Sequence, residues 1–454
     1  MRFFFIFHSF SIAIITYSLF ACSNSEFIGN SETFTDFQNS SPFLITSTSE
    51  TTSSSSIFHT YLPLDDTEYP YAGIPRIVIE TENHQAIKDR ETEIPAKLQI
   101  WGAKAPKTEI KNLTIRGRGN TSWDMPKKSY KIEFSQKQSL LNMPPDRDWA
   151  LIANYADKTL MKNYLMYNLS ASLDAYYAPR CEFIELYLNK EYLGVYLLTE
   201  TIKVSKNRVN IPKSNDAYLI EADANYRKSE QVVFSTIIKN DSAGRAFRVH
   251  EPKNASDTTL SIIEKHIQSF ETYLKKIDSS KNNRLDQWID INEYLKHYWV
   301  QEFSKNPDAS FRTSVFFTWQ KNDVIKIGPV WDFDLAFGNH FDDSWNSPEY
   351  WYVKLWYWNP LIFKDPSLKE KNLDYWIANR ETFYRTLNKI DSVHHLLQDA
   401  AQNNFRKWNI LQNVNRSYHK RAYATYDEAI DNLKEWIRKR TNWINEQMTK
   451  GAGS

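Results

Sequence analysis

Strand-forming segments fill the first half of this 454-residue chain, and helix-forming segments fill the second half. Alternating or β-branched apolar residues predict strands over 73–80, 97–101, 112–116, 129–134, 149–153, 182–188, 194–199 and 217–221, with one helix over 158–173 among them. Apolar residues at helical spacing predict helices over 260–277, 291–303, 373–390 and 427–448. This order predicts an α+β protein with two lobes, a strand-rich N-terminal half and a helix-rich C-terminal half.

The N-terminus predicts export and lipid attachment. An apolar run at residues 3–20 follows Arg2, and Ala21 then precedes Cys22. This arrangement is typical of a bacterial lipoprotein signal, so we expect residues 1–21 to be removed and Cys22 to carry the lipid. Two or three acyl chains, at roughly 0.8 kcal/mol per buried methylene, would anchor the chain to a membrane. The alternatives are a plain transmembrane anchor and an ordinary signal peptide with an incidental cysteine.

Lipid attachment places the protein in the cell envelope, at the periplasmic face of the outer membrane or at the cell surface. Residues 22–65 are rich in Ser and Thr and show no hydrophobic period, so we expect a flexible tether there. The formal net charge is only +1 and gives no sign of a nucleic-acid partner.

Two acids, Asp332 and Asp334, lie in the otherwise apolar segment GPVWDFDLAFGN at residues 328–339. Burying an ionised carboxylate is costly unless a cation or hydrogen bonds compensate its charge. The pair therefore predicts a metal site, a pairing with Arg or Lys, or a backbone cap. Glycoside hydrolysis by the two carboxylates is disfavoured, because nothing nearby supplies the distinct environments that an acid and a base need.

A third acid, Asp308, precedes Asp332 by about two dozen residues, with a strand-forming segment between them. This spacing is close to that between the catalytic loop and the metal-binding loop of protein kinases. Asp308 would then orient a substrate hydroxyl while Asp332 holds a metal ion. The structural alternative is that Asp308 caps a turn and that arginines pair with the other two acids.

A basic turn lies in the segment IRGRGNTSWDMPKKSYKIEF, which carries Arg116, Arg118, Lys128 and Lys131. A tight turn with exposed backbone N–H groups can bind phosphates. The segment lacks the Walker and G-x-G-x-x-G patterns, so the alternative is a β-hairpin with a solvated basic edge. We expect Glu200, at the end of a later strand, to reach Lys131 across the sheet.

Five segments resemble, in order, the CotH (spore coat protein H) kinase family: IRGRGNTSWDMPKKSYKIEF, LLNMPPDRDWALIANYADKTLMKN, FIELYLNKEYLGVYLLTE, YLIEAD and GPVWDFDLAFGN. The resemblance implies an atypical protein-kinase-like, two-lobed fold over residues 70–448. It also implies an exported kinase that uses ATP with Mg²⁺ or Mn²⁺ to phosphorylate Ser or Thr of secreted or surface proteins.

The resemblance also implies roles for individual residues. Asp308 would be the catalytic acid and Asp332 a metal ligand, with Asp334 as a second ligand or a structural partner. Carboxylate ligands of this kind suit Mg²⁺ or Mn²⁺. Glu200 would orient Lys131, and the residues that contact the ATP phosphates would be Lys131, Lys128, Arg116 and Arg118.

Some positions depart from the kinase pattern. Thr313 stands where protein kinases carry an Asn for a second metal ion, and Arg312 adds positive charge beside it. Lys162 replaces an expected Arg and loses its bidentate geometry. The alternative function is therefore a weak or inactive CotH-like surface protein that binds proteins or glycans. Its contact surface would be the aromatic segment 344–360, unless those rings pack as core or as a lid.

Overall fold

The computed structural model describes residues 61–238, 244–281, 283–415 and 417–451. The predicted signal segment 1–21, the lipidation site Cys22 and the tether up to residue 60 lie outside these ranges. Within them, no helix is both long enough and apolar enough to cross a membrane.

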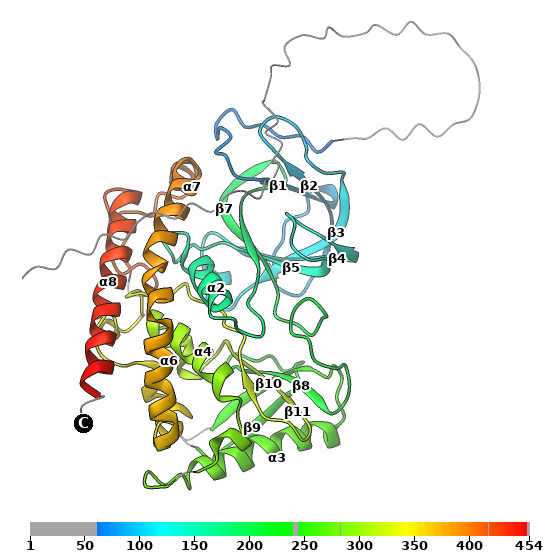
Figure 1. Ribbon diagram of the computed structural model, residues 1–454. Helices are drawn as coiled ribbons and strands as arrows, with labels where there is room; N and C mark the ends of the chain where they lie inside the picture. The colour runs from blue at the N-terminus through cyan, green and yellow to red at the C-terminus, as the bar shows by residue number, and fades with distance from the viewer. Residues whose placement is uncertain (1–60, 239–243, 282, 416, 452–454) are drawn as a thin grey trace, which may run out of the picture. The chain divides into compact units, whose positions relative to one another are not determined.

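A closed seven-stranded barrel forms the N-terminal part of the fold (Figure 1). Its strands follow the order β1-β2-β3-β4-β5-β7-β6, and every neighbouring pair is antiparallel except β1 with β6. The strands are β1 Arg76–Thr81, β2 Ile94–Trp101, β3 Lys111–Arg118, β4 Ser129–Gln138, β5 Asp146–Ile152, β6 Cys181–Leu188 and β7 Glu191–Glu200.

Side-chain alternation explains how the barrel is filled. On β4, Tyr130, Ile132 and Phe134 are buried, whereas Lys131 and Glu133 are only half-buried and lie on the other side of the strand. The inward residues join one apolar cluster with their counterparts from the other strands. The barrel interior is therefore a packed core.

A second, five-stranded sheet follows the order β12-β11-β8-β10-β9. Its strands come from both halves of the chain: β8 Ala217–Ala222, β9 Val232–Ser235, β10 Arg245–Glu251, β11 Val315–Gln320 and β12 Lys326–Ile327. Helix α3, Asp257–Leu274, packs against β9, and its N-cap Ser256 accepts a hydrogen bond from the Thr259 N–H. Figure 1 shows α3 running along this sheet.

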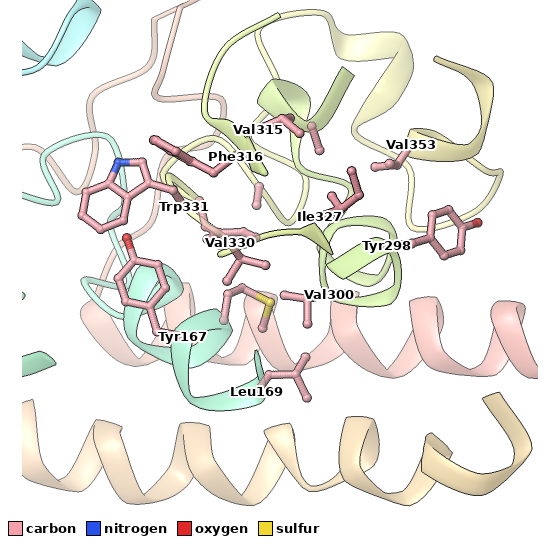
Figure 2. Close-up of a cluster of buried hydrophobic side chains, with 14 of the residues drawn as sticks. Tyr167, Leu169, Tyr298, Val300, Val315, Phe316, Ile327, Val330, Trp331 and Val353 are labelled. Atoms are coloured by element: carbon pink, nitrogen blue, oxygen red, sulfur yellow. The ribbon is translucent and has the colours of Figure 1, made fainter. Parts of the chain in front are cut away.

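The remaining helices connect and cover these sheets. The longer ones are α2 Lys162–Ser172, α4 Ile291–Ser304, α6 Pro366–Tyr384, α7 Thr386–Lys407 and α8 Tyr426–Gly451. The short ones are α1 Thr121–Asp124, α5 Asn359–Ile362, η1 Glu82–His84, η2 Leu285–Gln287, η3 Pro307–Ser310, η4 Asp343–Trp345 and η5 Val353–Leu355. Helix α8 contacts both α6 and α7 (Figure 1). Apolar residues from α2, α4, the second sheet and the following loop form one continuous core (Figure 2).

The α+β class with a strand-rich first half is confirmed, and two features differ from the prediction. The predicted helix 373–390 spans the junction at Arg385 between α6 and α7. Strands β9 and β10, which pair with each other in the second sheet and of which β10 also pairs with β8, lie outside the predicted strands. The predicted strands 182–188 and 194–199 lie in β6 and β7, which form a hairpin joined at Asn189 and Lys190.

Candidate active site

The segments that carry Asp308 and Asp332 meet at Asn306. Asp308 lies in the short helix η3, directly after α4, and Asp332 lies in the loop after β12. The Asn306 side chain accepts a hydrogen bond from the Asp308 N–H at 3.3 Å and donates one to the Asp332 carbonyl at 2.9 Å. It also donates to the Gln301 side chain at 2.9 Å. A single buried amide therefore joins the two loops to each other and to α4.

Aromatic packing fixes the backbone around Asp332. This residue has φ 62°, a left-handed conformation that Asp tolerates better than most residues do. Trp331 and Phe333 on either side are buried. The Trp331 ring stacks on Tyr167 of α2 at 5.5 Å, and the Arg118 guanidinium lies 5.3 Å from the Trp331 ring centre. Figure 2 shows the Tyr167 and Trp331 rings side by side.

The start of α2 holds Asp334. The Asn163 amide donates a hydrogen bond to the Asp334 carboxylate, and its oxygen accepts one from the Phe333 N–H at 2.8 Å. Beside it, the Lys162 ammonium donates to the Ala336 carbonyl at 2.9 Å. The single ammonium group of Lys162 therefore holds the backbone of this loop, without the two parallel hydrogen bonds that a guanidinium could donate.

The three aspartates are half-buried and share a region that has few cations. Burial raises the pKa of Asp308 well above its usual value and Asp332 raises it further, while Arg312 opposes this rise. Burial also raises the pKa of Asp332, which Arg118 opposes. The pKa of Asp334 rises to about 7, first through burial and then through the charge of Asp332. Ionised carboxylates in such a place are costly unless another positive charge is present.

This charge pattern fits a divalent cation that is shared with a substrate. Among the residues that the structure describes, no group of three or more His, Cys, Asp or Glu side chains is arranged to hold a metal ion. Asp332 and Asp334 therefore provide at most two protein ligands. Mg²⁺ is commonly held by one or two carboxylates, with substrate phosphates and water completing its coordination.

Two further acids lie at the end of β8, and one of them acts on the aspartates of this site. Glu221 raises the pKa values of both Asp308 and Asp332. Its carboxylate lies 2.7 Å from the His250 ring nitrogen. Asp223 accepts a hydrogen bond from the Thr313 hydroxyl at 3.4 Å. The sequence signal for these acids was the segment YLIEAD, in which two acids follow a buried strand.

Only one of the predicted basic residues reaches the aspartates. Arg118 is the cation that acts on Asp332. Arg116 donates to the Arg90 carbonyl at 2.6 Å, and Lys128 donates to the Trp123 carbonyl at 2.5 Å. Arg116 and Lys128 therefore stabilise the backbone in and around the basic turn.

The expected contact between Lys131 and Glu200 does not form. Lys131 pairs with Asp148 at 2.7 Å and with Glu133 at 2.8 Å, whereas buried Glu200 pairs with Arg180 at 2.9 Å. The reason is the strand order, because β5 lies between β4, which carries Lys131, and β7, which carries Glu200. The role of both residues in nucleotide binding stays a prediction.

The aromatic segment 344–360 is largely packed against α8 and the core. Arg440 of α8 donates hydrogen bonds to the Pro348 and Tyr350 carbonyls at 2.9 and 2.8 Å and forms a buried ion pair with Glu302. Tyr352, Tyr357 and Trp358 are buried, and the Tyr350 ring is the most exposed aromatic ring of the segment. This burial favours the core-packing alternative over a binding surface.

The fold and the site define an α+β protein in which a barrel and a second sheet accompany a buried, carboxylate-rich centre. A family model described as CotH kinase protein matches residues 115–444. The chain therefore belongs to the CotH kinase family. No curated protein matches the chain in a direct comparison.

Proposed function

We propose that this protein is an atypical protein kinase that transfers the γ-phosphate of ATP to Ser or Thr hydroxyls of secreted or surface proteins. The observation that carries the proposal is the contact of Asn306 with both aspartate-bearing loops. It joins the two loops that, in protein kinases, orient the substrate hydroxyl and hold the metal ion. Family membership supports kinase-type chemistry.

In this proposal the three aspartates have different roles. Asp308 accepts a hydrogen bond from the substrate hydroxyl and orients it, and its raised pKa suits a group that takes up a proton as the hydroxyl reacts. Asp332 and Asp334 would hold Mg²⁺ or Mn²⁺, which neutralises phosphate charge when bound. Asn163 keeps the Asp334 carboxylate in place.

ATP phosphates would contact Arg118, which already lies beside Trp331 and acts on Asp332. Lys131, Lys128, Arg116 and Glu200 make other contacts in this structure, and their part in ATP binding stays a prediction. The barrel would then serve as the nucleotide-binding lobe of a two-lobed, kinase-like arrangement. Cys22 would tether the enzyme to a membrane of the cell envelope.

The test is phosphoryl transfer by the full-length chain from radiolabelled ATP to a mixture of exported proteins, with Mg²⁺ or Mn²⁺. We expect metal-dependent labelling that falls by at least about 100-fold in Asp308→Asn and in Asp332→Asn. Asp399→Asn, at an exposed position of α7, is the matched control and keeps full activity. Equal labelling by wild type and Asp308→Asn would contradict the assignment.

A second candidate function is a binding protein that keeps the fold without catalysis. It is favoured by Thr313, whose hydroxyl contacts Asp223, and by Arg312, whose charge acts on Asp308. Thermal unfolding distinguishes the two candidates. A kinase that binds ATP with Mg²⁺ unfolds at a higher temperature in their presence. An unchanged midpoint at millimolar ATP and Mg²⁺ would favour the binding protein.

A further inference from the structure

A basic hollow opens beside the candidate active site, between the loop 156–162, the loop 337–339, the segment 419–423 and α8. It encloses about 460 Å³, part of which is open solvent. Four cationic side chains line it, together with one carboxylate, Asp157; the cations are Lys158, Lys162, Lys420 and Arg421. Asp308, Asp332 and Asp334 are not part of its lining.

The carboxylate of Asp157 is occupied by local hydrogen bonds. One oxygen accepts the Thr159 N–H at 2.8 Å and the Thr159 hydroxyl at 2.6 Å. The other accepts the Lys162 N–H at 2.9 Å. Asp157 therefore shapes the turn that leads into α2, and it is the one carboxylate among the four cations that line the hollow.

The two deeper lysines bind neutral groups. Lys158 donates to the carbonyls of Leu411, Asn413 and Arg421 at 2.8, 2.6 and 2.6 Å. Lys162 donates to the Ala336 carbonyl at 2.9 Å. Burial lowers the pKa of Lys158 to about 8, as expected for an ammonium group without a carboxylate partner. Backbone carbonyls therefore hold both ammonium groups, and the carboxylates of Asp157 and Asp334 act on Lys162 as well.

Arg421, at the mouth of the hollow, is available to a ligand. Arg421 is exposed, and it makes no side-chain hydrogen bond or ion pair with any residue that the structure describes. The Lys420 side chain is largely buried, and its ammonium donates to the Phe341 carbonyl at 2.8 Å and pairs with Asp343 at 3.2 Å. Because Asp343 is 81% exposed, this ion pair contributes little. An incoming anion would thus meet a guanidinium fork that is not hydrogen-bonded to any side chain or carbonyl of the described residues.

We propose that this hollow binds a tetrahedral oxyanion of the phosphate class, with Arg421 as its principal ligand and Lys420 as a second one. A planar guanidinium fork matches the oxygens of a phosphate, and a lining of four cations with one carboxylate favours a multivalent anion over a single carboxylate. The ligand is either free inorganic phosphate or the phosphoserine side chain of a polypeptide. Anion binding at this site does not require catalysis, so the proposed site and the proposed kinase function can be tested independently.

Isothermal titration calorimetry with the full-length chain tests the site. The probes are inorganic phosphate, a phosphoserine-containing peptide and the same peptide without phosphate. We expect binding of at least one phosphate probe, weakened by added salt, and no binding of the unphosphorylated peptide. Arg421→Ala should weaken binding at least tenfold, and Lys420→Ala should weaken it less. Arg438→Ala, at an exposed position of α8, should bind as wild type does.

The titration results identify the ligand or overturn the proposal. Binding of inorganic phosphate identifies the free ion as a ligand, and binding of the phosphopeptide alone identifies a phosphorylated polypeptide. Asp332→Asn should retain binding, because this carboxylate does not line the hollow. The proposal is overturned if neither probe binds, if Arg421→Ala binds as tightly as wild type, or if Asp332→Asn abolishes binding.

Discussion

At the scale of single residues, the candidate site depends on neutral amides as much as on charged groups. Asn306 joins the Asp308 and Asp332 segments, and Asn163 joins Asp334 to the start of α2. An amide can donate and accept at once, so one side chain can hold two backbone segments at a fixed separation. Replacing either amide should therefore disturb the geometry of the aspartates without changing the charge of the site.

Asn306→Ala is the sharper of these two substitutions. It leaves the Asp332 carbonyl and the Asp308 N–H without their partner, and we expect a loss of about 1–3 kcal/mol in the free energy of unfolding. We also expect phosphoryl transfer to fall at least about tenfold, because displaced catalytic groups lose rate steeply. Urea unfolding and a transfer assay measure the two effects.

The control for Asn306 is a buried Asn elsewhere. Asn359 accepts a hydrogen bond from the Tyr294 hydroxyl at 3.0 Å and donates one to the Val353 carbonyl at 2.8 Å. Asn359→Ala should destabilise the protein to a similar degree and leave more activity in the folded fraction. If both variants lose activity equally at equal stability, Asn306 has no special positioning role.

The charged residues of the site were predictable from the sequence, whereas the amides were not. A carboxylate in an apolar segment is conspicuous, because its burial needs an explanation. An Asn in a loop is common, because Asn caps turns and tolerates left-handed backbone. Nothing in the local pattern around Asn306 distinguishes a side chain that caps one turn from one that also reaches a loop two dozen residues away.

At the scale of secondary-structure elements, the fit of α7 against the barrel depends on a glycine. Gly194 of β7 has φ +91°, and the Asn404 side chain of α7 accepts a hydrogen bond from the next residue, Val195, at 3.1 Å. A Cβ atom at Gly194 would lie 2.5 Å from the Asn404 side-chain oxygen. The absent side chain therefore lets the helix approach the strand closely.

Gly194→Ala should destabilise the protein by about 2–4 kcal/mol, from backbone strain of about 1–2 kcal/mol and from the displaced contact with α7. The matched control is Gly73→Ala, because Gly73 has φ +82° and a Cβ atom added there would have no other atom within 4 Å. That variant should show the backbone strain alone. Urea unfolding midpoints with equal slopes give the difference, and equal losses would show that Asn404 simply moves aside.

The strands themselves were largely predictable, but the closure of the barrel was not. Alternation along β4 indicates which residues face inward, and it depends only on neighbours in the sequence. Closure depends on parallel pairing between β1 and β6, which places Arg76 opposite Glu185. That buried ion pair, at 3.0 Å, joins segments more than a hundred residues apart. The order of the strands in the sheet could not be predicted from the sequence either, and for this reason the expected contact between Lys131 and Glu200 was wrong.

At the scale of the whole molecule, buried histidines make stability depend on pH. His266, His297 and His419 lie in α3, in α4 and in the loop before α8, and burial lowers their pKa values to about 4, 3 and 4. An unfolded chain binds protons at histidine near pH 6.5. Between that pH and the lower folded values, the unfolded state holds more protons. Each histidine therefore contributes stability above pH 6.5 that is lost as the pH falls toward 4.

His297→Gln tests this argument at the histidine whose pKa is lowered furthest, to about 3. Its contribution to the pH dependence is at most about 1.4 kcal/mol per pH unit between pH 6.5 and 4, and the substitution should remove it. Because carboxyl groups titrate in the same range, the informative quantity is the difference in free energy of unfolding between variant and wild type, measured with urea from pH 7.5 to 4.5. His84→Gln, at an exposed position in η1, should follow the wild-type curve. If His297→Gln instead runs parallel to wild type, the imidazole of His297 takes up its proton in the folded protein as easily as in the unfolded chain.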